Sequence, residues 1–461
     1  MTARIEPSPA LFSALRALLG ERFSVSPYDI ESHARDESWH EPEPPDGVAF
    51  VESTEEAAAV VRLCAEHHTP IVPFGAGTSV EGHVQAVRGG VSLDLSRMKA
   101  ILSIEPDDLD CRVQAGVTRM QLNRELEKQG LMFPVDPGAD ATLGGMAATG
   151  ASGTTTVRYG AMRENVLGLT VVTADGRIVK TGGRARKSSS GYDLTRLFVG
   201  SEGTLGVITE LQLRLQPLPE AVSSAVCAFE SLDGAVDCVV EALQSAIPVA
   251  RCELLDEASI DAVNGYSKLD LPRAPTLFLE FHGTQSSVAE QAELSRAIAA
   301  QHGGGEFRWS ARREDRDKLW EARHKAYYAL KALRPGARGW PTDVVVPISK
   351  LAECIRETVA DCGSLGLLAP VLGHVGDGNF HVAFLFDEGD AEELGRVREA
   401  NRRLIARALA MGGACTGEHG VGLGKIEALE AEHGEGVELM RKIKQALDPE
   451  GLLNPGKVFR D

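Results

Sequence analysis

Short apolar runs separated by glycine turns dominate the first half of the chain. Runs of this length, rich in valine, leucine and isoleucine, predict strands. The predicted strands cover Pro70–Pro73, Val91–Leu95, Leu169–Thr173 and Leu211–Leu215. A helix is expected before them, over residues 53 to 68, because Ser53 and Glu56 have the spacing of a capping box. Its apolar positions share one helical face: Ala57, Val60, Val61 and Cys64.

The pattern changes after Pro217 and Pro219, which mark a plausible domain boundary. Beyond them strands alternate with longer helical periods. Strands are predicted at Ala225–Phe229, Thr276–His282 and Asp343–Val346. Helices are predicted at 232–244, 286–301, 311–333, from Ser349 onward, and at the C-terminus through Val437, Met440, Ile443 and Leu447. Strands paired with helices on one side predict a compact α+β domain.

A chain of 461 residues is too long for a single hydrophobic core, so two or three domains are expected. The boundaries place a first domain at 1–219, a second at 220–420 and a C-terminal segment at 421–461. The formal net charge of −18 and the lack of a basic block argue against nucleic acid or an anionic membrane as a partner.

The 8 cysteines show no Cys-x-x-Cys pair and no dense framework, which favours reduced core thiols. The N-terminus lacks a signal-peptide pattern, and no apolar run approaches the roughly 20 residues that span a bilayer. We therefore expect a soluble, cytoplasmic protein without a membrane span.

Two motifs near the C-terminus gather residues that bind metals. They are Gly373-His-Val-Gly-Asp-Gly-Asn-Phe-His381 and Gly417-Glu-His-Gly-Val-Gly422. Two histidines and a carboxylate are a usual ligand set for a catalytic metal with an open position, so His374, His381 and Glu418 are candidate ligands. His419 would then serve in proton transfer. The alternative is that these histidines are turn residues and that Glu418 is an ordinary surface or capping carboxylate.

Four glycine-rich loops in the first half expose backbone N–H groups without bulky side chains. Such loops bind phosphate oxygens closely. Together they indicate one long phosphorylated ligand. A complete Gly-x-Gly-x-x-Gly after a strand is absent, as is the phosphate loop of nucleotide triphosphatases, which leaves a flavin dinucleotide in another fold. The loops are Phe74–Ser79, Asp136–Gly145, Gly150–Gly153 and Gly200–Gly206.

The loop motifs, with Val157-Arg-Tyr-Gly160 and Gly200-Ser-Glu-Gly-Thr-Leu-Gly-Val-Ile-Thr209, resemble the FAD-binding domain of the vanillyl-alcohol oxidase and p-cresol methylhydroxylase (PCMH) family. The C-terminal motifs and Asp448-Pro-Glu-Gly-Leu-Leu-Asn-Pro-Gly-Lys457 resemble its D-lactate dehydrogenase, D-2-hydroxyglutarate dehydrogenase and glycolate oxidase branch. The stretch Leu319–Tyr328 is most similar to the FAD-linked D-lactate dehydrogenases of the mitochondrial type. The resemblance implies an α+β protein: a two-part FAD-binding domain of PCMH type and a cap domain of antiparallel sheet covered by helices.

The resemblance also implies roles for individual residues. His374, His381 and Glu418 match the metal ligands, and His419 matches the proposed base. Arg323 would bind the substrate carboxylate, although an i,i+4 surface pairing on its helix is the alternative, and Asn379 would lie near flavin and substrate. The residues expected to line the FAD are Pro73, Gly75, Ala76, Gly77, Thr78, Ser79, Pro137, Gly138, Thr142, Gly144, Gly145, Ser152, Gly153, Glu202, Gly203, Ile208 and Asn454.

Two differences from relatives narrow the expected substrate and the expected attachment of FAD. D-2-hydroxyglutarate dehydrogenases carry a lysine where this chain has Pro341, which favours a monocarboxylic substrate. Some relatives attach FAD to a histidine of the first loop, but no histidine occurs between Pro73 and Gly82, so non-covalent FAD is expected despite the nearby His83.

The sequence therefore predicts an FAD-dependent, metal-assisted oxidoreductase that converts a D-2-hydroxy acid, with D-lactate to pyruvate favoured. The alternatives are a broader D-2-hydroxy acid or glycolate dehydrogenase, either alone or as one subunit of a complex, or a non-catalytic flavin-binding subunit. Zinc, manganese and iron all suit the ligand set. The electron acceptor would be a cytochrome, a quinone or an electron-transfer flavoprotein. The sequence leaves the oligomeric state open, with a homodimer as one alternative.

Overall fold

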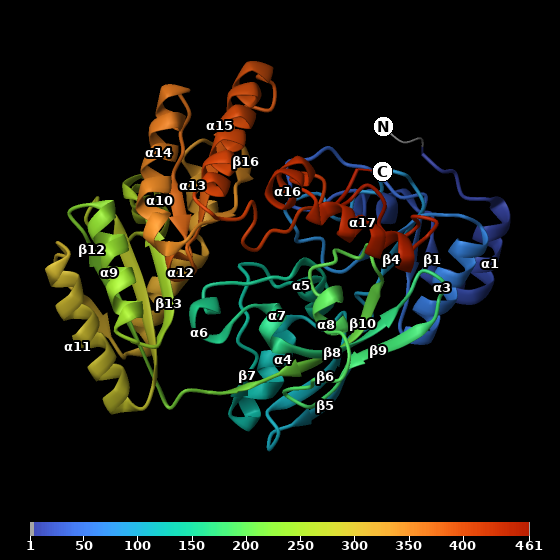
Figure 1. The fold of residues 1–461 in the computed structure, drawn as a ribbon, viewed down its shortest axis with the longest axis horizontal. Coiled ribbons are helices and arrows are strands. Elements are labelled where there is room, and N and C mark those ends of the chain that lie inside the picture. The colour runs from blue at the N-terminus through green and yellow to red at the C-terminus, as the bar shows by residue number, and fades with distance from the viewer. Residues whose placement is uncertain (1–3, 461) are drawn as a thin grey trace. The chain divides into compact units, whose positions relative to one another are not determined.

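The computed structural model describes residues 4–460 and divides into two compact units. Within the described residues, unit 1 consists of residues 4–152, 160–218 and 418–460, and unit 2 consists of residues 153–159 and 219–417. The segment 153–159 falls within the first expected domain but packs with unit 2. The elements of each unit are labelled in Figure 1.

Unit 1 contains a four-stranded sheet and a five-stranded sheet, with a short two-stranded pair beside them. The first sheet has the order β1 (Phe23–Ser24), β2 (Gly47–Phe50), β4 (Val91–Asp94), β3 (Ile71–Phe74). The second has the order β5 (Ile101–Glu105), β6 (Asp110–Gln114), β10 (Val207–Arg214), β8 (Val166–Val172), β9 (Ile178–Gly182). The pair is β11 (Gln216–Pro217) with β7 (Leu131–Met132).

Nine α-helices accompany these strands within the described part of unit 1. They are α1 (Pro9–Leu19), α2 (Pro27–Ser32), α3 (Thr54–Glu66), α4 (Arg119–Leu126), α5 (Leu143–Thr149), α7 (Met162–Asn165), α8 (Leu194–Phe198), α16 (Ile426–His433) and α17 (Gly436–Leu447). The capping box expected at the start of α3 is present, since the Ser53 hydroxyl accepts the Glu56 N–H at 3.1 Å. The helix buries the predicted apolar face, through Ala57, Val60, Val61 and Cys64.

The C-terminal segment returns to the edge of the first sheet. Leu453 forms a parallel bridge with Ile71, and the Asn454 N–H donates to the Ile71 carbonyl at 2.7 Å. The strands β2, β4 and β3 are parallel to one another, so this bridge lies beside the outermost of them. Leu453 and Asn454 are thereby held next to β3, the strand that leads into the first glycine-rich loop.

Unit 2 is built on one antiparallel sheet. Its order is β15 (Arg308–Ser310), β12 (Ala221–Ala228), β14 (Thr276–Gly283), β13 (Val249–Leu255), β18 (Val371–Gly373), β19 (Asn379–Phe386), β16 (Arg338–Pro341), with β17 (Val344–Val345) also paired to β19. The accompanying α-helices are α6 (Thr156–Tyr159), α9 (Leu232–Gln244), α10 (Glu257–Ser267), α11 (Gln285–Gln301), α12 (Arg313–His324), α13 (Ala326–Ala332), α14 (Leu351–Ser364) and α15 (Ala391–Ala410).

Two predicted elements of unit 2 differ from the structure. The helical stretch expected over 311–333 is divided at Lys325 into α12 and α13. At this point the His324 ring contacts the Trp320 carbonyl at 2.6 Å, a local side-chain contact of the kind that disturbs the helical ladder. The strand expected over 343–346 is shortened to Val344–Val345.

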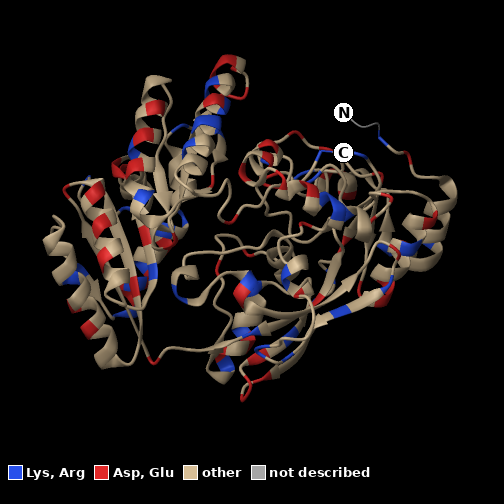
Figure 2. Cartoon of the chain, in the orientation of Figure 1, with Lys and Arg blue, Asp and Glu red and all other residues tan. Residues whose placement is uncertain are grey.

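Charged residues of both signs are interspersed along α15, where arginine positions, blue in Figure 2, lie between acidic ones, drawn in red. The 8 cysteines are all buried thiols, and burial raises the pKa of Cys64 to about 12. Within residues 4–460, we find no helix with the length and apolar character needed to cross a bilayer.

Candidate functional site

Unit 2 brings two histidines together at the paired strands β18 and β19 of its sheet. His374 directly follows β18, and His381 lies in β19 opposite Leu372. A short 3₁₀ turn, η4 (Val375–Asp377), links the two strands, and Gly378 closes it with a φ of +78° that favours glycine. The two imidazole rings lie 5.5 Å apart between centroids, with an interplanar angle of 84°. The turn expected from the sequence therefore does place both rings together.

Each ring is oriented through its Nδ1 atom. Nδ1 of His374 lies 2.7 Å from Oε1 of Glu253, and Nδ1 of His381 lies 2.8 Å from the Thr342 carbonyl oxygen. A carboxylate and a carbonyl only accept hydrogen bonds here, so each Nδ1 is the donor, and in the neutral form of each ring the lone pair lies on Nε2. Histidines that bind metals are usually held in this way by a carboxylate or carbonyl partner. The donor set therefore suits a divalent metal.

Glu253 of β13 also binds Arg323 of α12. Nη2 of Arg323 lies 2.5 Å from Oε2 of Glu253, and the two residues are 7% and 0% exposed. The alternative of a surface i,i+4 pair for Arg323 is thus wrong, because the side chain is buried and its partner is on a strand. Nε of Arg323 is buried without a hydrogen-bond partner within residues 4–460. Glu253 was not predicted from the sequence, because neither a motif nor a predicted strand marks this lone glutamate, which the structure places in β13 (Val249–Leu255).

Asn379, the first residue of β19 and two residues before His381, is held by Asp343. Its amide nitrogen donates to Oδ1 of Asp343 at 2.7 Å and to the Val344 carbonyl at 2.9 Å. The other carboxylate oxygen of Asp343 accepts the Thr416 hydroxyl at 2.6 Å and the Gly417 N–H at 2.8 Å. Asp343 therefore fixes the two residues that come directly before Glu418, the last of the expected metal ligands.

In unit 1 the glycine-rich loops lie against one another. A Cβ added at Gly75 would meet the Thr142 hydroxyl oxygen at 2.4 Å, and one at Gly203 would meet Pro73 at 3.0 Å. The Glu202 N–H donates to the Ala148 carbonyl at 2.8 Å. Residues 75–80 and 148–150 are nonetheless only partly covered by protein, and Gly138 is exposed. Closely packed loops that leave their backbone accessible suit a long phosphorylated cofactor.

The other residues expected to line the FAD occupy varied positions. Gly144 and Gly145 begin α5, which Thr142 caps, and Ile208 is buried in β10. Ser152 donates its hydroxyl to Glu418 at 2.9 Å, within unit 1. Gly153 is the first residue of the segment that packs with unit 2. Ala76 is exposed at the tip of the first loop.

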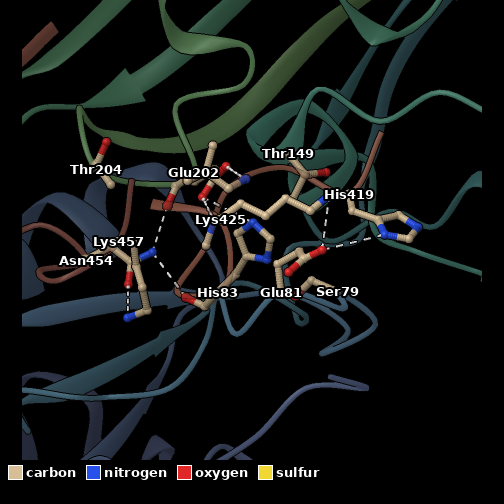
Figure 3. A network of polar contacts seen from close by, with 12 residues as sticks. Ser79, Glu81, His83, Thr149, Glu202, Thr204, His419, Lys425, Asn454 and Lys457 are labelled. Atoms are coloured by element: carbon tan, nitrogen blue, oxygen red, sulfur yellow. Dashed lines mark hydrogen bonds and ion pairs between the residues drawn. The ribbon is translucent and has the colours of Figure 1, made fainter. Parts of the chain in front are cut away.

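Glu202 and Asn454 join the fourth loop to the C-terminal segment, as Figure 3 shows. The Glu202 carboxylate accepts the N–H groups of Val421 and Gly422 at 2.6 and 2.8 Å and lies 3.1 Å from Nε2 of His83. Burial opposes ionisation of Glu202, but the charge of His83 and these N–H groups outweigh it and lower its pKa. Likewise burial disfavours the charged form of His83, but the nearby Glu202 carboxylate raises its pKa. The amide of Asn454 donates to the carbonyls of Glu202 and His83.

His419 lies beside a buried carboxylate in the same network (Figure 3). Its Nδ1 is 3.8 Å from Oε1 of Glu81, and the same oxygen is 3.2 Å from Nζ of Lys425. Glu81 and Lys425 are 1% and 4% exposed. No local sequence pattern marks Glu81 or Lys425 as a site residue, although Glu81 lies two residues beyond the first glycine-rich loop.

Comparisons with known proteins agree with these features. The family described as FAD linked oxidases, C-terminal domain, matches residues 218–458, and the FAD binding domain family matches residues 45–182. A Danio rerio protein described as a probable mitochondrial D-lactate dehydrogenase is 50% identical over 99% of this chain and 93% of the relative. The mitochondrial D-lactate dehydrogenase (cytochrome) of Arabidopsis thaliana is 44% identical over 97% of this chain and 80% of the relative.

The solved structures support the architecture. Substrate-bound p-cresol methylhydroxylase superposes with a TM-score of 0.77 over 99% of this chain and 98% of that chain, at 18% identity. This likeness concerns the fold, and it confirms the predicted FAD-binding domain of PCMH type with an antiparallel α+β domain. The expected cytoplasmic location stays a prediction, because both named relatives are described as mitochondrial. The chain belongs to the FAD-linked oxidase family of oxidoreductases, in the branch that contains the D-lactate dehydrogenases.

Proposed function

We propose that the protein oxidises a D-2-hydroxy acid, with D-lactate to pyruvate as the favoured reaction, using non-covalent FAD and one divalent metal. The observation that carries this proposal is the pair of Nδ1-anchored histidines, because Glu253, which holds His374, also holds the buried Arg323. The names of the two relatives support D-lactate. Bound FAD supplies a hydride acceptor, and a bound divalent ion supplies a Lewis acid that lowers the pKa of a hydroxyl group.

His374, His381 and Glu418 are the proposed metal ligands. They offer two imidazole nitrogens and a carboxylate oxygen, a set able to hold a metal ion. Asp343 supports this assignment because it anchors Thr416 and Gly417, from which Glu418 follows directly. Zinc, manganese and iron are the candidate ions.

Arg323 is the proposed carboxylate-binding residue. Its Nη2 atom is paired with Glu253, and its buried Nε has no hydrogen-bond partner within the described chain. A buried donor without an acceptor is costly, and a substrate carboxylate would supply two acceptor oxygens. Asn379 lies on the histidine strand and is proposed as a neighbour of the substrate.

His419 is the proposed base that takes the substrate hydroxyl proton. Since its Nδ1 is turned toward Glu81, proton transfer is assigned to Nε2. Glu81 would stabilise the imidazolium that forms, because an opposite charge nearby favours the protonated ring. Histidine suits this role because its unperturbed pKa of about 6.5 lies near physiological pH.

A monocarboxylic substrate is supported by Pro341. In β16 this residue pairs with Ala383 of β19, two residues from His381. Cross-strand partners and residues two apart share one sheet face, so position 341 lies on the face of His381. Proline supplies no cation at this position for a second carboxylate.

Anaerobic titration of the purified enzyme with D-lactate, with L-lactate as the control, tests the proposal. Bleaching of the visible flavin band by the D enantiomer alone is expected. If a preparation containing flavin and metal is not bleached, D-lactate is wrong, and glycolate and larger D-2-hydroxy acids should be tried next. The reduced enzyme can then be mixed with cytochrome c, a quinone analogue and an electron-transfer flavoprotein, beginning with cytochrome c because the Arabidopsis relative bears that acceptor in its name.

A further inference from the structure

Glu253 is the one carboxylate that contacts both a proposed metal ligand and the proposed substrate arginine within the described part of unit 2. Its Oε1 lies 2.7 Å from Nδ1 of His374, and its Oε2 lies 2.5 Å from Nη2 of Arg323. The residue is 0% exposed. Each of its two oxygens therefore contacts a different side chain. One side chain is a proposed metal ligand, and the other is the proposed substrate-binding arginine.

We propose that Glu253 is a positioning residue that couples metal binding at His374 to substrate carboxylate binding at Arg323. This inference rests on the proposed function. A metal that draws electron density from the His374 ring makes its Nδ1–H a stronger donor to Glu253, which holds the carboxylate in place. A fixed carboxylate in turn holds the planar guanidinium of Arg323 in one orientation, ready for a bidentate substrate.

The charge of Glu253 matters as well as its shape. A buried guanidinium requires a compensating anion, and Glu253 is the partner on Arg323. In E253Q the amide oxygen can still accept from His374, but the amide NH₂ group then faces Nη2 of Arg323, donor against donor. The amide cannot satisfy both neighbours, so either the metal ligand or the arginine loses its orientation.

Glu280 provides a matched control in the same sheet. It lies on the neighbouring strand β14, is 4% exposed, and likewise contacts an arginine and a histidine. Its Oε1 is 3.3 Å from Nη1 of Arg251 and 2.8 Å from Nε2 of His282. Neither partner is a proposed metal or substrate residue, so E280Q removes an equivalent buried charge without touching the site.

The experiment measures metal affinity by competition with a chromophoric chelator, using zinc, with and without pyruvate on the oxidised enzyme. In the wild type, pyruvate should tighten zinc binding, and zinc should tighten pyruvate binding by the same factor. In E253Q, zinc affinity should fall about 10-fold to 100-fold and the mutual tightening should disappear. E280Q should retain both the zinc affinity and the mutual tightening of the wild type. E253D keeps the charge and should recover part of the coupling, which guards against a folding defect in E253Q.

Two outcomes separate a wrong role for Glu253 from a wrong proposed function. If the wild type binds zinc and E253Q matches E280Q in both zinc affinity and coupling, the role of Glu253 is overturned while the proposed function stands. If the wild type oxidises D-lactate but binds no divalent metal after reconstitution, the metal in the proposed function is wrong, and the role of Glu253 falls with it.

Discussion

The carboxylate of Glu81 and the ammonium group of Lys425 lie 3.2 Å apart, and both are buried in unit 1. Glu81 thus connects the region of the first glycine-rich loop to the C-terminal segment that begins with Glu418 and His419. A buried pair is costly to break on one side, because the remaining charge loses compensation.

E81Q is therefore expected to lower the free energy of unfolding by up to about 3 kcal/mol. K425M should cost a similar amount, and the double variant E81Q/K425M should cost less than the sum, because it removes both charges together. Urea unfolding of the FAD-loaded proteins measures these free energies of unfolding. Strictly additive losses would show that the two groups do not interact.

H419A should retain FAD and metal but lower kcat about 100-fold to 10,000-fold, the usual contribution of a positioned general base. The flavin spectrum confirms cofactor binding, and anaerobic stopped-flow reduction by D-lactate gives the rate. H433A is a suitable control, because His433 contacts Glu432 on a surface helix. A rate within a few-fold of the wild type would exclude His419 as the base.

Removal of the metal ligands should remove the metal. H374A and H381A are expected to be purified without zinc, manganese or iron, as measured by inductively coupled plasma mass spectrometry, and to lose D-lactate oxidation while still binding FAD. H282A is the matched control, since His282 is a buried histidine of the same unit with a glutamate partner. Metal retained in both site variants would contradict the ligand assignment.

Burial raises the pKa of Asp256, the N-cap residue of α10, from 3.8 to about 6. The folded state then binds more protons than the unfolded state between about pH 4 and pH 6, so this group favours folding at low pH and opposes it above pH 6. D256N keeps a good N-cap without the charge. The side chain is partly reached by solvent, so we expect a gain of about 1–2 kcal/mol at pH 8 that vanishes near pH 4. Equal stability of D256N and wild type across this range would contradict the raised pKa.

P341K should shift substrate preference toward a dicarboxylic acid, because it adds a cation on the sheet face of His381. The ratio of kcat/KM for D-2-hydroxyglutarate to that for D-lactate is expected to rise at least 10-fold, about 1.4 kcal/mol of discrimination. P341A separates loss of proline from gain of charge. An unchanged ratio in P341K would mean that the substrate does not extend over this face.

Local patterns alone predicted several elements of the fold. Ser53 and Glu56 marked the start of α3, and the apolar period over 232–244 matched α9 at both ends. These features depend on neighbouring residues, so they can be read along the chain. The break between α12 and α13 could not be predicted, because no glycine or proline stands at Lys325 and the contact of His324 with the Trp320 carbonyl is visible only in the structure.

For the candidate site too, some features could be predicted from the sequence and others could not. The sequence by itself determined the residue types available for chemistry: the two histidines around a glycine turn, the Glu418-His419 pair, and four loops with accessible backbone. Their spacing is local, and side chains with metal-binding chemistry are recognisable without coordinates. Only the tertiary structure decided the partners that orient them. Glu253 lies 121 positions from His374 and 70 from Arg323, and Glu81 lies far from His419 along the chain, so strand pairing and burial had to bring these carboxylates into contact before their charges could act.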